Sequence, residues 1–194
     1  MVLYILKNFN WLDVFVFIVL FRISYIAIKS GFAVELFKFL GVLCAVYLSL
    51  HYYVLLSDFI GDRFNLKNAP KEYLISFIFT ILAIFGYWVF IILRKILARF
   101  VLLEPLPSLN KWGGFILGIA RFILYISLIM YLFIISPVGY LRHSVNSSFS
   151  SRYLLKAAPV TYSGLWKGII SKFIPQEKFN QDVLRVTDEQ KAKK

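Results

Sequence analysis

The sequence has 194 residues, of which 60% are hydrophobic and 19% aromatic, while only 16% are charged. This composition excludes an ordinary soluble domain, in which about 25% of the residues are charged, and it predicts an integral membrane protein. The basic residues that give the formal net charge of +12 gather at the ends of apolar segments and in the C-terminal tail. Such a distribution favours anionic lipid headgroups, rather than nucleic acid, as their partner.

Four apolar segments are long enough to cross the hydrocarbon core, which takes about 20 helical residues. They predict an all-α, polytopic fold in which a four-helix transmembrane domain occupies residues 1–136. A signal peptide is the alternative for the first segment, but no small-residue cleavage site follows its apolar core, so we expect an uncleaved span. The expected spans lie at about 11–29, 33–56, 73–94 and 112–135.

The sequence changes character after the fourth span. Residues 137–175 predict an amphipathic membrane-surface segment, because apolar residues recur at helical spacing while Lys167 and Lys172 lie off that stripe. Trp166 is then expected at the level of the headgroups. The alternative is a helix that packs the same stripe on the protein's own spans. The polar, mixed-charge residues 176–194 predict a disordered tail.

The start of the fourth span, "NKWGGFILGIAR" (110–121), combines small and polar residues within an apolar run. On a helix, Asn110, Gly114, Gly118 and Arg121 occupy one stripe. Small residues four apart, the Gly-x-x-x-Gly pattern, let a second helix backbone approach closely in lipid. The stripe therefore predicts contact with protein, either with a second copy of the chain or with the first or second span.

Charged residues inside the spans form two expected groups. Arg121 costs about 2.5–3.5 kcal/mol in a span unless it finds a partner. Antiparallel threading puts Glu35 and Arg22 at similar depth, so Glu35 is its expected partner. On the opposite side, Asp13 and His51 are expected to pair in the same way. The alternatives are that each side chain reaches water independently, or that these groups serve transport or a proton relay.

The sequence shows no enzyme signature. It has no HExxH zinc motif, no GxSxG elbow and no glycine-rich phosphate loop, and its two histidines, His51 and His143, lie in separate regions. A single cysteine, Cys44, excludes a disulfide framework and a thiolate metal cluster. We therefore expect a non-enzymatic protein that uses no cofactor and no metal.

Three stretches together resemble the colicin V production protein family (CvpA) of bacterial membrane proteins: "NWLDVFVFIVLF" (10–21), "IKSGFAVEL" (28–36) and "LNKWGGFILGIAR" (109–121). In that family an aspartate opens the first span, a Gly-Phe pair in the first turn precedes a glutamate, and a D-R-x-x-G-x-x-x-G-x-x-R-G pattern opens the last span. Asn110, Lys111 and Phe122 depart from the last pattern, where the family has aspartate, arginine and glycine. The matching residues here are Asp13, Gly31, Phe32, Glu35, Gly114, Gly118 and Arg121.

The resemblance implies a multi-pass protein of the bacterial inner membrane that supports toxin production and export or maintenance of the cell envelope. The alternative is an oligomeric small-solute transporter or channel, since four spans from one chain rarely enclose a path. Expected partners are the bilayer with its anionic lipids, a second copy of the chain, or an envelope or secretion protein. Basic residues in the short connections favour both termini outside the cytoplasm.

Overall fold

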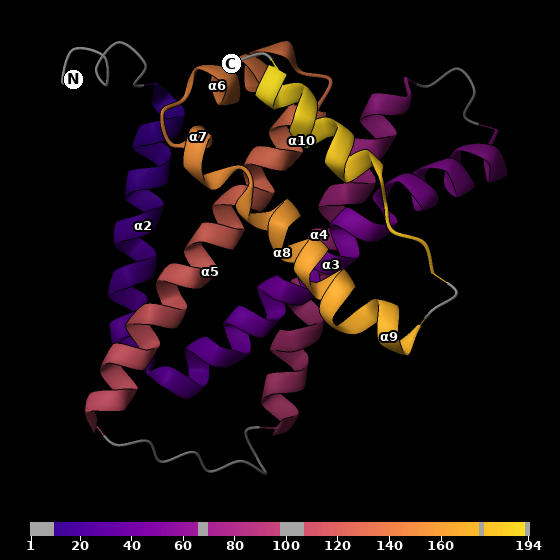
Figure 1. The fold of residues 1–194 in the computed structure, drawn as a ribbon. Helices are drawn as coiled ribbons and strands as arrows, with labels where there is room; N and C mark the ends of the chain where they lie inside the picture. The colour runs from indigo at the N-terminus through magenta and orange to yellow at the C-terminus, as the bar shows by residue number, and fades with distance from the viewer. Residues whose placement is uncertain (1–9, 66–69, 98–106, 175–176, 193–194) are drawn as a thin grey trace.

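The fold is a bundle of four long helices with a layer of short helices on one side (Figure 1). The computed structural model describes residues 10–65, 70–97, 107–174 and 177–192, and these contain no β-strand. The long helices are α2 (Trp11–Ser30), α3 (Phe32–Arg63), α4 (Lys71–Leu97) and α5 (Pro107–Ile135). All four are long and apolar enough to cross a membrane, which confirms the predicted all-α, polytopic fold.

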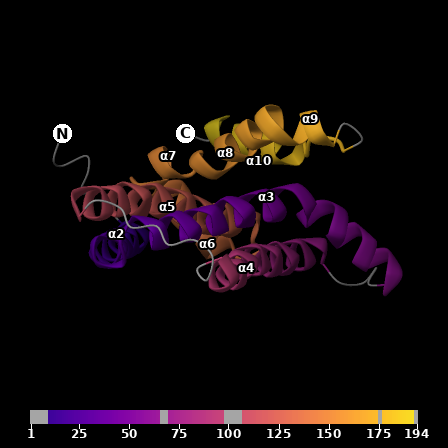
Figure 2. The same ribbon diagram turned by 90° about the horizontal axis from the view of Figure 1, so that it is seen from below.

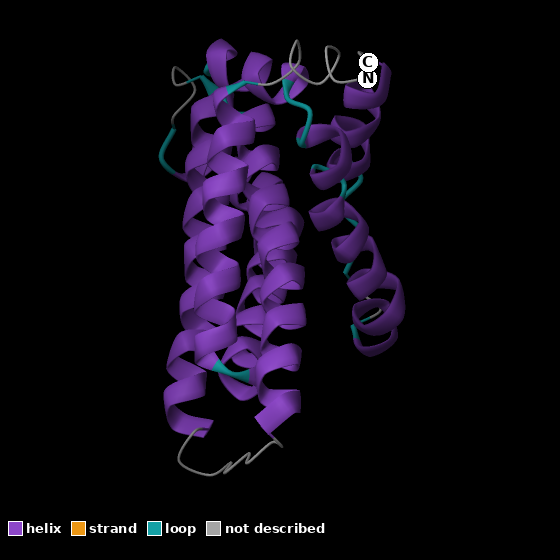
Figure 3. Cartoon of the chain, turned by 90° about the vertical axis from the view of Figure 1, so that its left-hand side faces the viewer, coloured by secondary structure: helices purple, strands orange, loops and turns teal. Residues whose placement is uncertain are grey.

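The four long helices pack in the spatial order α2, α5, α3, α4. The remaining helices are α6 (Gly139–Ser147), α7 (Ser151–Leu154), α8 (Ala157–Leu165), the π-helix η1 (Trp166–Ile170), α9 (Ser171–Phe173) and α10 (Asp182–Ala192). Figures 2 and 3 show α7 to α10 as a separate layer that runs alongside the bundle. This C-terminal layer contacts the bundle through α3 and α5.

Two apolar clusters hold these layers together. The first joins α3, α4 and α5 to the C-terminal layer, and the second joins α2 and α5 to α6 and the residues around α7. Their fully buried side chains come from segments far apart in the sequence, including Leu50, Phe79, Tyr131 and Tyr162 in the first, and Leu12, Ile126, Met130 and Val145 in the second.

Two predicted span boundaries differ from the structure. α3 continues seven residues past the expected end at residue 56 and ends at Arg63, so part of the expected polar connection is helical. Its polar end is tied to the next helix, because Asp58 of α3 lies 2.7 Å from Lys71 of α4. α5 begins at Pro107 rather than near residue 112, because proline is compatible with the first position of a helix.

The C-terminal part departs further from the sequence-based expectation. Trp166 is 9% exposed and packs against His51 of α3, so it follows the alternative of packing on the protein's own spans rather than the expected headgroup position. The basic residues Lys167 and Lys172 are exposed, as their place off the stripe implies. The tail was expected to be disordered, but its described part contains α10, and Val183 is fully buried there.

The glycine stripe of α5 is used within the chain. A Cβ atom added at Gly114 would lie 2.9 Å from the carbonyl oxygen of Ala27, and one added at Gly118 would overlap the Ala27 methyl group. α5 therefore approaches the end of α2 more closely than any larger residue at these positions would allow. Of the two partners that the sequence left open, the structure has the stripe facing the chain's own first two spans.

We predict that Gly118→Ala lowers the free energy of unfolding by about 1–3 kcal/mol, because the added methyl group overpacks the contact with Ala27. The matched control is Gly164→Ala in α8, where nothing lies within 4 Å of an added Cβ, so this change should be neutral or slightly stabilising. Thermal unfolding of the purified chain in detergent compares the two variants. Equal stability of both variants would contradict the tight contact.

Candidate functional site

An ion pair joins the start of α3 to α5 inside the bundle. Glu35 is fully buried, and its Oε2 atom lies 2.9 Å from Nη2 of Arg121. Its other oxygen, Oε1, accepts a 2.6 Å hydrogen bond from Nζ of Lys38, one turn further along α3. The expected Glu35–Arg121 pair is therefore present, and Lys38 is a second cation at the same carboxylate that the sequence analysis missed.

The turn between α2 and α3 places Glu35 in this position. Gly31 ends α2 with φ +78°, a conformation that favours glycine, and an added Cβ there would overlap the side chain of Asn110. Asn110 lies inside α5, and its Oδ1 accepts a 2.7 Å hydrogen bond from the backbone N–H of Phe32. Asn110 thus caps α3 from another helix, and these residues meet at one joint of α2, α3 and α5.

Arg22 lies beside this joint but pairs with no acidic group among the described residues. Its side chain is exposed, and it lines a cavity of about 710 Å³ between α2, α3, α4 and α5. Arg121 lines the same cavity, and Thr80, Tyr87 and Tyr125 add polar groups to a wall that is otherwise apolar. Arg22 and Arg121 are therefore close because they line the same cavity, and only Arg121 pairs with Glu35.

Asp13 holds the other end of α2. It is 1% exposed and forms a capping box with Asn10, the residue that caps the helix. Its Oδ1 atom also accepts hydrogen bonds from the Ser148 hydroxyl at 2.7 Å and from the Ser150 backbone N–H at 2.8 Å. Asp13 therefore fastens the connection between α6 and α7 to the first span.

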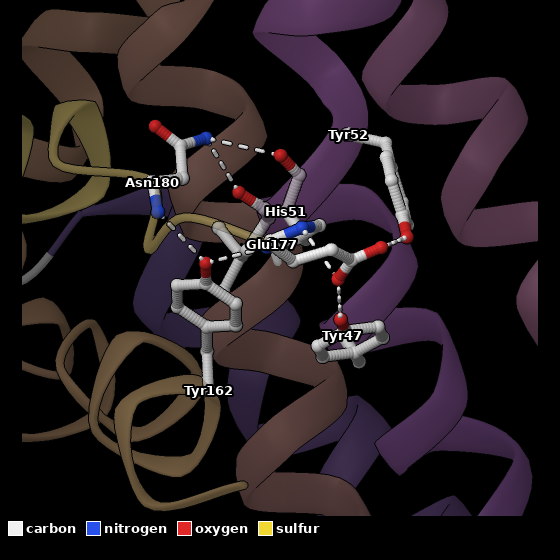
Figure 4. Close-up of polar contacts among 7 residues, drawn as sticks. Tyr47, His51, Tyr52, Tyr162, Glu177 and Asn180 are labelled. Carbon is white, nitrogen blue, oxygen red and sulfur yellow. Dashed lines mark hydrogen bonds and ion pairs between the residues drawn. The ribbon is translucent and has the colours of Figure 1, made fainter. Parts of the chain in front are cut away.

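The expected pairing of Asp13 with His51 is wrong. His51 lies well inside the long helix α3, and its polar partners come from the C-terminal layer (Figure 4). Its Nε2 atom is 3.2 Å from Oε2 of Glu177, and its Nδ1 atom is 2.8 Å from the hydroxyl of Tyr162. Glu177 belongs to the tail that was expected to be disordered, and Tyr162 belongs to the segment for which packing on the spans was one of two open alternatives, so neither was considered as a partner of His51.

Glu177 accepts hydrogen bonds from two more side chains of α3. Tyr52 donates to Oε1 at 2.6 Å and Tyr47 donates to Oε2 at 3.0 Å. Nearby, the Asn180 side chain donates a 2.8 Å hydrogen bond to the carbonyl of Leu50, and its backbone N–H donates to Tyr162 at 3.1 Å (Figure 4). We use the name tyrosine lock for the six residues of this polar cluster, which are Tyr47, His51, Tyr52, Tyr162, Glu177 and Asn180.

The tyrosine lock has a fixed protonation pattern near neutral pH. Hydrogen bonds from Tyr52 and Tyr47, together with the nearby His51, hold the pKa of Glu177 below its ordinary value of 4.5. Burial raises the pKa of Tyr162 to about 12. Glu177 is consequently an ionised acceptor for the hydroxyl groups of Tyr47 and Tyr52, an arrangement that fastens the C-terminal layer to α3.

Of the functional residues that the sequence analysis did not identify, Asn10 has a recognisable sequence pattern and Glu177 has none. The spacing of Asn10 and Asp13, "NWLD", is that of a capping box and identifies Asn10 as a helix cap from sequence alone. Glu177 has no such local signal, since its partners are more than 100 positions away in the chain. Among the described residues, no three His, Cys, Asp or Glu side chains are grouped so that they could hold a metal ion.

Comparison with known proteins identifies one matching family. Residues 12–159 match the family described as "Colicin V production protein". This region begins one residue before Asp13 and includes the four spans, α6, α7 and the first turn of α8. No curated protein and no solved structure matches the chain. The matched region contains Glu35, Arg121 and the joint around them, while Glu177 lies beyond its end.

We predict that alanine substitutions of Glu35 and Arg121 lower the free energy of unfolding by different amounts and that the two effects are not additive. Glu35→Ala leaves two cations without their carboxylate and should lower the free energy of unfolding by about 3–5 kcal/mol. Arg121→Ala should cost less, because Glu35 keeps Lys38. Denaturation in mixed micelles of the two single variants and the double variant measures the coupling, which we expect to be about 0.5–3 kcal/mol.

The control for this cycle is the pair of exposed Glu72 and half-exposed Arg142, whose charged atoms lie 3.4 Å apart. Replacing both residues by alanine should give losses that add to within about 0.5 kcal/mol, because solvent screens this pair. Additive losses at Glu35 and Arg121 as well would show that the buried contact contributes no coupling and would contradict its role at the joint.

We predict that the C-terminal layer loosens in acid. Because the pKa of Glu177 is lowered in the folded state, its contribution to stability is complete above pH 4.5 and is lost as the pH falls through the lowered value. Hydrogen exchange of α10, corrected for the intrinsic effect of pH, should therefore accelerate below about pH 4.5. Glu177→Gln should exchange faster already at pH 7 and show little further change.

The matched control for Glu177→Gln is Asp182→Asn, which removes a half-exposed carboxylate at the start of α10 whose ion-pair partner in the described part of the chain is Arg185 of the same helix, at 3.7 Å. This variant should retain the slow exchange and the acid response of the unmodified chain. The same exchange rates in Glu177→Gln and the unmodified chain at pH 7 would refute the stabilising role of the tyrosine lock.

Proposed function

The chain belongs to the colicin V production protein family, and from this membership we propose that it is a non-enzymatic protein of the bacterial inner membrane. Its proposed role is to support the production and export of a peptide toxin or the maintenance of the envelope. The observation that carries the proposal is the coincidence of the family region, residues 12–159, with the four-helix bundle. A supporting role of this kind depends on a stable membrane-embedded body that a partner protein or lipid can recognise.

The positions of the charged side chains support a non-enzymatic role. Asp13 fastens α6 and α7 to α2, and Glu35 and Arg121 join α3 to α5. Each carboxylate is therefore engaged in holding helices together and is not free to serve as a general base. We propose that the outward surface of the bundle, rather than a reacting group, carries the cellular role.

We further propose that both termini lie outside the cytoplasm. The start of α2 and α6, the helix that follows the last span, lie at the same end of the bundle, because the Asn10 side chain donates a 2.7 Å hydrogen bond to the carbonyl of Ser144 in α6. The other side holds the joint, with Lys29 and Lys38 near the short turn between α2 and α3. Basic residues in a short connection favour the cytoplasmic side.

A second candidate function is transport of a small solute by an oligomer. The cavity lined by Arg22 and Arg121 favours this candidate, because charged residues within a span often mark a solute pathway. The glycine stripe does not contribute to it, since Gly114 and Gly118 are already in contact with the chain's own helices. An oligomer would therefore have to form through another face.

A complementation experiment tests the proposed role. In a colicin V-secreting strain that lacks the chromosomal gene, we expect less toxin in the medium, more toxin retained in the cells and poorer survival in dilute detergent. Expression of the unmodified chain should restore all three. Asp13→Ala should fail to restore them, because it removes a buried acceptor and releases α6 and α7 from α2, at a cost of about 2–4 kcal/mol.

The matched control is Asp58→Ala, which removes a half-exposed carboxylate that pairs with Lys71 at the surface. It should restore secretion and survival fully. Unchanged toxin secretion and survival in cells without the chain would refute the supporting role. Movement of a small solute into vesicles that contain the purified chain would favour transport instead.

A further inference from the structure

The cavity between α2 and α4 has the dimensions and the position of a ligand site. Its volume of about 710 Å³ falls in the range of about 300–1,000 Å³ that is usual for small-molecule pockets. Its wall is mainly apolar along most of its length, with contributions from all four long helices, and includes Phe15, Val19, Phe79, Ile84, Leu128 and Leu132. The lining residues all belong to membrane-spanning segments, so a ligand would enter from the bilayer.

Positive charge gathers at one end of this cavity. Arg22 and Arg121 both line it. Gly118 of α5 is in contact with Ala27 of α2, and the two helices run antiparallel. Arg121, about one turn after Gly118, therefore lies near the level of Arg22, which precedes Ala27. The cavity lining contains no acidic side chain. A site with two guanidinium groups at one end and an apolar wall elsewhere is complementary to an amphiphilic anion.

The charges around the joint do not balance within the described residues. Glu35 is the carboxylate for both Lys38 and Arg121, while Arg22 has no acidic partner. The Arg121 side chain is 10% exposed, yet its Nε atom is buried without a hydrogen-bond partner in the described part of the chain. Among the described residues, Lys38, Arg121 and Arg22 are thus accompanied by one carboxylate, an excess of positive charge that is costly inside a membrane unless an anion balances it.

The depth of Arg22 in the membrane determines which kind of anionic amphiphile can reach it. It is the twelfth residue of the 20-residue helix α2 and so lies roughly 18 Å from the helix start and 12 Å from its end, within the hydrocarbon layer. A phospholipid would have to bring its phosphate, glycerol and headgroup to this depth, at a high desolvation cost. A carboxylate at the end of a single alkyl chain is small enough to reach both arginines.

We propose that this cavity binds a long-chain fatty-acid anion. Its carboxylate lies between Arg22 and Arg121, where it forms charge-assisted hydrogen bonds with the guanidinium groups of both residues. Its alkyl chain lies along the apolar wall toward the Trp11 end of α2, where it makes van der Waals contacts with side chains of the long helices. The site is inferred from the cavity alone and does not depend on the cellular role proposed above.

Binding is tested with the purified full chain in detergent and radiolabelled palmitate as the probe. We expect saturable binding that unlabelled palmitate displaces and that methyl palmitate, which lacks the charge, does not. Arg22→Gln should raise the Kd about tenfold, because it removes one charge-assisted contact. Since Arg22 is exposed and contributes no ion pair within the described chain, this variant should keep the thermal stability of the unmodified protein.

Two further variants separate the cavity from other surfaces. Ala83→Trp fills the cavity with a bulky ring and should abolish saturable binding. Lys29→Gln removes an exposed cation of α2 that is outside the cavity lining and should leave the Kd unchanged. Unaltered binding in both Arg22→Gln and Ala83→Trp would overturn the proposed site.

Competition identifies the class of ligand. Phosphatidylglycerol and inorganic phosphate should each displace palmitate poorly, because the first has a large headgroup and the second has no alkyl chain. Displacement by phosphatidylglycerol at the same concentration as palmitate would overturn the fatty-acid assignment in favour of a phospholipid. Displacement by inorganic phosphate alone would show that the arginines recognise a free anion, and this result too would overturn the proposal.

Discussion

The buried carboxylate of Glu35 is the interaction on which the packing of the bundle depends. Hydrocarbon offers no water to solvate an ion, so Glu35 and Arg121 remain inside the membrane only while each is near the other. That requirement fixes the distance between α3 and α5, while the glycines of α5 allow the end of α2 to approach the same helix closely. Gly31 and Asn110 then set where α3 begins, so a single turn of chain determines the relation of three helices.

The same constraint is met differently at the other end of the molecule. Asp13 is buried with neutral donors rather than a cation, and the serines it binds belong to the connection between α6 and α7. Glu177 brings a charge from outside the spans to the polar side chains of α3. Polar residues thus organise two interfaces, one among the spans and one between the spans and the C-terminal layer.

Sequence reasoning succeeded where the physics is local or one-dimensional. Span length, the spacing of Gly114 and Gly118, and antiparallel threading were enough to predict the helical bundle and the approach of Glu35 to Arg121. It failed for His51, because its ion-pair partner Glu177 lies in the polar tail, where no local pattern indicates a contact with α3. The polar composition of that segment suggested disorder, but apolar residues such as Val183 are sufficient to bury it against the bundle.

The cap at the start of α3 has a consequence for the electrostatics of the whole joint. Relative to the family pattern, in which an aspartate occupies the position of Asn110, this chain carries one negative charge fewer beside Gly31. The Asn110 amide accepts the hydrogen bond from Phe32, as a carboxylate could, but it adds no negative charge to the joint. An amide at this cap therefore leaves the potential at the joint more positive than an aspartate would, which favours anions in its neighbourhood.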